Sequence, residues 1–79
     1  MRILDVTSDK SIDNVALLLT KTEATQLMSY LESLTKEDLD WHYHLNNEDY
    51  SKEITIALYD ESNLTIFSDR CKSLIIDDK

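Results

Sequence analysis

Hydrophobic residues recur at three- and four-residue spacing over residues 19–34, and alternate with polar residues in other parts of the chain. The helical spacing joins five side chains into one apolar stripe: Ala24, Leu27, Met28, Leu31 and Leu34. The opposite face is polar: Thr25, Gln26, Ser29, Glu32 and Ser33. This pattern is typical of an amphipathic helix that packs one face on an apolar surface and leaves the other in water.

The start of this helix is marked by Thr20 and Glu23. In a capping box, the threonine hydroxyl accepts a hydrogen bond from a free amide of the first turn, and the glutamate carboxylate reaches back to the amide of the threonine. We therefore predict the main helix over about residues 21–35.

Two segments in the second half of the chain alternate with a period of two, which is typical of half-buried strands. In residues 41–46, one side holds Trp41, Tyr43 and Leu45, and the other holds His42, His44 and Asn46. In residues 53–59, one side holds Ile54, Ile56 and Leu58. The polar stretch between these segments predicts a hairpin.

Three shorter apolar segments are also predicted as strands. Residues 2–7 and 15–19 are bounded by polar residues and are expected to pair as a first hairpin. Residues 64–67 follow a turn of Asp, Glu, Ser and Asn and are expected to form a short fifth strand.

The C-terminal segment admits two interpretations. Ser68 is a suitable N-cap, and Phe67, Cys71 and Leu74 follow helical spacing. A strand would instead group Lys72 and Leu74 with Ile76. We favour a short helix over about residues 69–75.

These elements together predict one compact domain over residues 1–79, of the α+β class. The simplest arrangement that buries the stripe has two layers, with a largely antiparallel sheet of four or five strands and the main helix on one face. A chain of 79 residues can form only a small core.

The chain contains no glycine and no proline. Its turns must therefore be closed by Asp, Asn and Ser, whose side chains hydrogen-bond the nearby backbone. The phosphate-binding loops of Rossmann and P-loop proteins require glycine, so both classes are excluded.

Cys71 is the only cysteine, which excludes an internal disulfide and a cysteine-based zinc site. The first residues lack the apolar run of a secretory leader, and the longest apolar run is far shorter than the about 20 residues that span a bilayer. These features favour a cytoplasmic protein.

The formal net charge is −8. This field repels nucleic-acid backbones and anionic membranes, so we expect no direct contact with either, and it accelerates association with a basic protein. The densest acidic stretch lies within residues 37–50 and interleaves with aromatic residues, as expected of a surface with aromatic anchors and charged rims. The candidate partner-binding residues are Glu37, Asp38, Asp40, Trp41, Tyr43, Glu48, Asp49 and Tyr50. The polar helix face is the second candidate, through Gln26, Ser29, Glu32 and Ser33.

His42 and His44 share one face of a predicted strand and are the only candidates for metal ligands, with Glu48 or Asp49 from the following loop. Two histidines without a cysteine do not define a metal site, and the sequence predicts no metal or other cofactor. The alternative is a pair of solvent-exposed histidines whose contacts depend on pH.

No catalytic arrangement is indicated. Cys71 falls on the apolar stripe of the last predicted helix, where a thiol is normally inert. The acidic pairs Asp60–Glu61 and Asp77–Asp78 lie in a turn and in the C-terminal tail, where burial cannot raise a carboxyl pKa. We expect the protein not to be an enzyme.

The sequence therefore predicts a small acidic binding module that neutralises a basic protein partner, such as a toxin or a nucleic-acid enzyme, by steric and electrostatic blockade. In composition it resembles immunity proteins and phage-type inhibitors, and no motif assigns it to a particular family. Two alternatives stay open. One is a structural homodimer that pairs through a sheet edge, at residues 2–7 or 64–67. The other is a metal- or pH-responsive regulator that uses His42 and His44.

Overall fold

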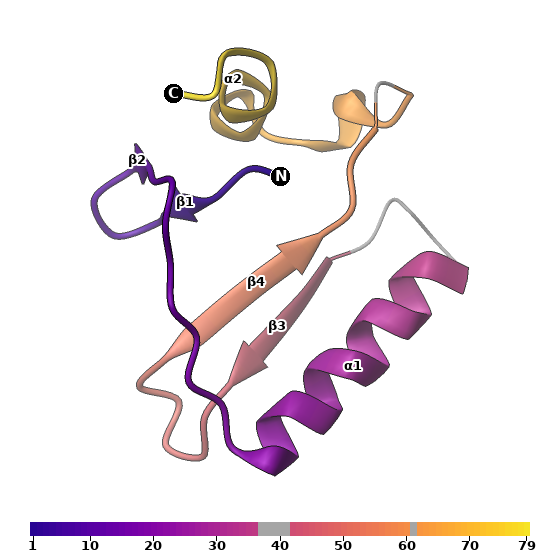
Figure 1. Ribbon diagram of the computed structural model, residues 1–79. Helices are drawn as coiled ribbons and strands as arrows, with labels where there is room; N and C mark the ends of the chain where they lie inside the picture. Colours follow the sequence, from indigo (N-terminus) through magenta and orange to yellow (C-terminus); the bar gives the residue numbers. More distant parts are fainter. Residues whose placement is uncertain (37–41, 61) are drawn as a thin grey trace.

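The structure of the protein is a computed structural model that describes residues 1–36, 42–60 and 62–79. Its elements follow the order β1 (Leu4–Asp5), β2 (Lys10–Ser11), α1 (Lys21–Lys36), β3 (His42–Asn46), β4 (Glu53–Ala57), η1 (Leu64–Ile66) and α2 (Asp69–Asp77). Figure 1 shows α1 beside the β3–β4 hairpin, with β1, β2 and α2 gathered at the opposite end near both chain termini. The chain is therefore α+β, as predicted.

The sheet is smaller than predicted. In the described residues, β1 pairs only with β2 and β3 pairs only with β4, so two antiparallel hairpins replace the expected sheet of four or five strands. The first hairpin closes on Lys10–Ser11, which pairs with Leu4–Asp5. Residues 15–19 run without regular structure to the start of α1, so their prediction as a strand is wrong.

Residues 64–67 do not form a strand. Leu64–Ile66 is a 3₁₀-helix, in which the Phe67 amide donates to the Leu64 carbonyl at 3.1 Å. The buried Asn63 side chain holds the preceding turn, because its Oδ1 accepts from the Asp60 amide at 2.7 Å and its Nδ2 donates to the Leu58 carbonyl at 3.1 Å. This local hydrogen bonding turns the chain into α2, and the sheet edge expected at residues 64–67 does not exist.

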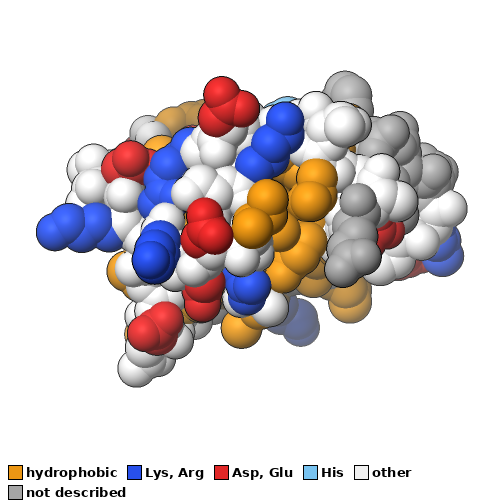
Figure 2. Space-filling model, turned by 90° about the horizontal axis from the view of Figure 1, so that it is seen from above, with side chains coloured by type: hydrophobic (Ala, Val, Ile, Leu, Met, Phe, Trp, Pro, Cys, Tyr) orange, Lys and Arg blue, Asp and Glu red, His pale blue; other side chains and the backbone are white. Residues whose placement is uncertain are grey.

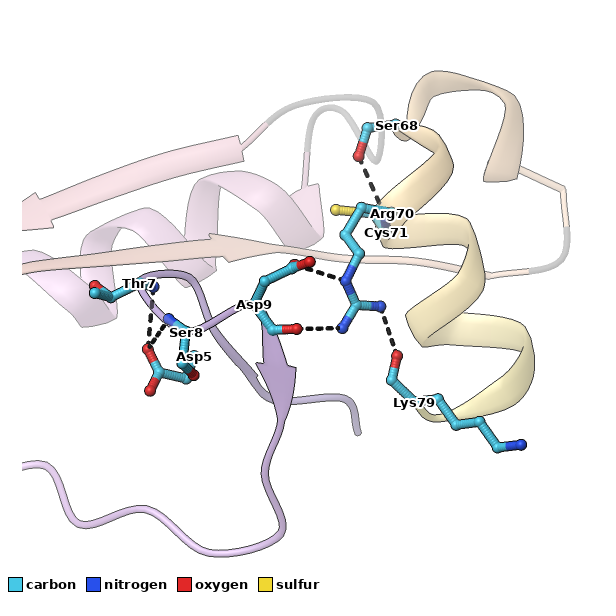
Figure 3. Close-up of polar contacts among 8 residues, drawn as sticks. All are labelled: Asp5, Thr7, Ser8, Asp9, Ser68, Arg70, Cys71 and Lys79. Carbon is cyan, nitrogen blue, oxygen red and sulfur yellow. Dashed lines mark hydrogen bonds and ion pairs between the residues drawn. The ribbon is translucent and has the colours of Figure 1, made fainter.

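Both helix starts follow the sequence prediction. The Thr20 amide donates to Glu23 Oε1 at 2.8 Å and Thr20 Oγ1 accepts from the Glu23 amide at 3.1 Å, which completes the capping box. Ser68 caps α2, since its Oγ accepts from the Cys71 amide at 3.2 Å (Figure 3). The predicted C-terminal helix is confirmed, and it ends at Asp77.

The apolar stripe of α1 is only partly buried, which corrects the sequence prediction. Leu34 is buried and Leu27 is half-buried, whereas Ala24, Met28 and Leu31 are exposed. The reason is the width of the sheet: two strands about 4.8 Å apart cannot cover a helix about 10 Å across together with its flanks. Within the described residues the buried hydrophobic core consists of Leu34, Leu45 and Leu74.

Two arginines join the β1–β2 hairpin to α2. Arg70 Nε donates to Asp9 Oδ1 at 2.7 Å and Arg70 Nη2 donates to the Asp9 carbonyl at 3.2 Å (Figure 3). Arg2 Nε donates to the carbonyls of Leu74 and Ile75, which belong to the last turns of α2. These contacts fasten the N-terminal hairpin to the C-terminal helix.

Candidate partner-binding groove

A groove of about 710 Å³ lies between the first turns of α1 and the loop that joins β3 to β4. The two elements meet because α1 and β3 run in opposite directions, so the end of β3 returns to the start of α1 (Figure 1). The residues that line the groove are mostly polar: Thr20, Thr22, Glu23, Gln26, Tyr30, His44, Asn46, Asn47, Glu48, Asp49 and Tyr50.

The lining of the groove contains three carboxylates, those of Glu23, Glu48 and Asp49, and no lysine or arginine. The Asp49 carboxylate accepts hydrogen bonds from the side chain and from the amide of Ser51. Both lower the pKa of Asp49 from its ordinary value of 3.8, and the side-chain bond has the larger effect. Asp49 therefore stays ionised at neutral pH and well into the acidic range. The groove has the charge needed to accept a cationic side chain.

The β3–β4 loop is held in shape by its own side chains. Asn47 Oδ1 accepts from the Lys52 amide at 3.0 Å, and Asn47 Nδ2 donates to Ser51 Oγ at 3.0 Å. The Ser51 amide in turn donates to Asp49 Oδ1 at 3.0 Å. A loop that is ordered before binding loses less conformational entropy when a partner docks.

Tyr50, in the same loop, combines a left-handed backbone with an exposed side chain. Its φ is 58°, in the left-handed region that a bulky residue rarely adopts, and 77% of the residue is exposed. Such backbone strain costs about 1–3 kcal/mol and is found more often at functional sites than elsewhere. The loop thus presents an aromatic ring to solvent at the rim of an acidic groove.

The structure brings together three of the residues predicted from the sequence, Glu48, Asp49 and Tyr50, with Gln26 from the polar helix face. Tyr43 does not join them, because it is half-buried and its ring stacks on that of Tyr30. The other four predicted residues lie outside the described residues: Glu37, Asp38, Asp40 and Trp41.

Sequence reasoning missed the contribution of the helix N-terminus, where Thr22 and Glu23 face the loop. The short connection between α1 and β3 could have indicated it, because such a connection makes the two elements antiparallel neighbours. The sequence predicted only a capping role for Glu23. In the structure Glu23 completes the capping box and also lines the groove.

His42 and His44 stay side by side on the exposed face of β3, with ring centroids 5.0 Å apart and ring planes at 85°. His44 Nδ1 lies 2.9 Å from Thr55 Oγ1 and 3.2 Å from Glu53 Oε1. Among the described residues, no three side chains of His, Cys, Asp or Glu converge to hold a metal ion, so the suggested set of two histidines and a loop carboxylate does not assemble.

No protein-family model matches this chain, and no curated protein or solved structure is significantly similar to it. Among the residues that the structure describes, no helix has the length and apolar character required to cross a membrane.

Proposed function

We propose that the protein is a small acidic binding module that acts without catalysis, and that it blocks a basic surface of a partner protein through the groove between α1 and the β3–β4 loop. The observation that supports this most directly is that Glu23, Glu48 and Asp49 line one groove with the exposed Tyr50, in a lining without lysine or arginine. A neutralising role of the immunity or phage-inhibitor type fits this surface.

In this mechanism, a lysine or arginine of the partner enters the groove and pairs with the carboxylates of Glu48 and Asp49. The ring of Tyr50 packs against the cation and the apolar stem of the same side chain. The net charge of −8 guides the basic partner to the groove over a longer range. The bound module then covers the basic surface that its partner uses.

The test compares two double variants that remove the same amount of charge. Glu48→Gln/Asp49→Asn removes two carboxylates from the groove, and Asp69→Asn/Asp77→Asn removes two from α2 at the other end of the molecule (Figure 1). Both variants have a formal net charge of −6, against −8 for the natural chain. A basic protein captured by the immobilised natural chain serves as the probe, and its association rate is measured by biolayer interferometry.

We expect the groove variant to slow association by about tenfold, and the α2 variant by about twofold or less. The rate for the natural chain should also fall steeply as the salt concentration rises. Equal losses in the two variants would mean that only the net charge matters. Unchanged binding by the groove variant would place the contact elsewhere, and either result would contradict the proposal.

A further inference from the structure

The outer flank of α1 carries a seam of residues spaced three and four apart. The seam consists of Lys21, Ala24, Met28, Leu31 and Thr35, all of which are exposed. Met28 is 64% exposed and Leu31 is 40% exposed, although both are large hydrophobic residues in a regular helix. Alternating spacing of three and four is the pattern by which two helices pack along each other.

This seam and the groove lie on opposite flanks of α1. Successive helical residues are rotated by about 100°, so Leu27 and Leu34 mark the line where α1 meets the hairpin. Glu23 and Gln26 lie to one side of that line, in the groove wall, and Met28 lies to the other side. A protein that covers the seam therefore leaves the groove open.

The whole chain exposes more surface than a compact monomer of its size. Its accessible surface is 6352 Å², which exceeds the value for a folded monomer of 9.2 kDa by about 1,400 Å². Its radius of gyration is 13.2 Å, against about 11.6 Å for a compact domain of 79 residues. One side of a stable protein interface covers about 800 Å², so the excess is large enough for one.

The charges on α1 favour a second copy as the occupant of the seam. The chain as a whole has a net charge of −8, but α1 carries two lysines, Lys21 and Lys36, and two glutamates, Glu23 and Glu32. Its local charge is therefore zero, so another copy is not repelled there and a basic partner is not attracted. Lys36 pairs with Glu32 of the same helix at 2.7 Å, and an antiparallel pair of helices places opposite helix dipoles together.

A different apolar area lies near the chain termini. Figure 2, which looks down on the end that holds α2, shows hydrophobic side chains gathered between charged ones. The exposed hydrophobic residues of the elements at this end include Ile66 and Ile76, which are 45% and 66% exposed. They do not form a spaced seam along one helix, and we use Ile76 as the matched control.

We propose that α1 is a homodimer interface, in which the seams of two copies pack antiparallel around Met28. Ala24, a small residue, lets the helix backbones approach closely, and Leu31 of one copy packs near Ala24 of the other. The dimer holds two grooves, one in each copy, and both stay open to partners.

Sedimentation equilibrium of the full chain over the micromolar range tests the proposal. We expect a reversible dimer, and we expect Met28→Glu to raise the dimer dissociation constant by at least about tenfold, because each dimer then holds two unpaired buried charges. Ile76→Glu introduces the same charge at an equally exposed position of α2 and should leave the constant unchanged. Circular dichroism checks that both variants keep the helical content of the natural chain.

A second measurement uses disulfide formation in a Cys71→Ser background. Met28→Cys places two thiols across the symmetry axis and should oxidise to a covalent dimer, whereas Gln26→Cys, which is turned by about 160° around α1 from Met28, should form no covalent dimer. A natural chain that is monomeric throughout the concentration range would overturn the proposal. A dimer that is not weakened by Met28→Glu but dissociates in the Ile76→Glu variant would also overturn the proposal. Since Met28→Glu leaves the groove intact, the rate at which it binds a basic partner tests the proposed function independently.

Discussion

The ring of Tyr30 on α1 stacks on the ring of Tyr43 on β3, with centroids 4.8 Å apart and planes inclined by only 3°. This pair joins the helix to the hairpin at the place where the sequence predicted a partner-binding aromatic residue. Tyr43 is therefore a packing residue in this structure.

Removing either ring should destabilise the fold. We expect Tyr30→Ala and Tyr43→Ala each to lower the free energy of unfolding by about 2 kcal/mol, because both residues are half-buried. The double variant should lose about 1 kcal/mol less than the sum of the two single losses, because the coupling energy of a stacked pair is counted in both single variants. Urea denaturation followed by circular dichroism measures these values, and additive losses would show that the stack contributes nothing beyond its burial.

The capping box allows the structural and binding roles of one residue to be separated. Thr20→Ala should lower the free energy of unfolding by about 1 kcal/mol, since an amide of the first turn loses its acceptor. Glu23→Gln should change stability little, because glutamine also completes a capping box.

The same Glu23→Gln change removes a charge from the groove and should weaken binding of the basic partner. Thermal unfolding and biolayer interferometry measured on the same samples distinguish the two roles. A Glu23→Gln variant that loses stability and retains full affinity would contradict the position of Glu23 in the binding surface.

The strained backbone of Tyr50 predicts a trade-off between stability and function. Asparagine adopts the left-handed conformation more readily than tyrosine, so Tyr50→Asn should leave the free energy of unfolding unchanged or raise it by about 1 kcal/mol. Because the exposed ring is lost, affinity for the basic partner should fall by about tenfold. Loss of stability in Tyr50→Asn would mean that the ring supports the loop itself.

Three aspartates should make the fold sensitive to acid. The pKa values of Asp5, Asp49 and Asp60 are lowered, mainly by hydrogen bonds from Ser8, Ser51 and Ser62 respectively. A carboxyl group with a lower pKa in the folded state binds its proton more readily when unfolded, so its stabilisation is complete above its ordinary pKa of 3.8. The free energy of unfolding should therefore fall as the pH drops through 3.8 and below.

Urea denaturation at a series of pH values checks this expectation. Replacing all three aspartates with asparagine keeps a side-chain oxygen for the turn amides and removes the titrating groups. This variant should show a shallower loss of stability in acid than the natural chain. An identical slope in both proteins would assign the acid sensitivity to other carboxyl groups.

The sequence by itself determined the features that depend on neighbouring residues. Thr20 and Ser68 cap their helices, because an N-cap needs only an amide two or three residues further along the chain. The alternation around Tyr43 and Leu45 predicted which side of β3 is buried, since successive strand side chains point to opposite faces. The absence of glycine predicted turns closed by aspartate, and Asp5, Asp49 and Asp60 accept the turn amides.

Only the tertiary structure decided which apolar residues find partners. Residues 15–19 and 64–67 have the composition of strands, but a strand also needs a neighbour with free backbone groups, and local bonds such as those of Asn63 compete with it. Likewise, helical spacing joined Met28 and Leu34 into one stripe, but against the narrow two-stranded hairpin Leu34 is buried and Met28 stays exposed. The groove depends on the return of β3 to the start of α1, which brings Glu23 and Asp49 into the lining of one groove although the two are far apart in sequence. Local periodicity records which side chains share a face, whereas burial is decided by the width and position of what packs against that face.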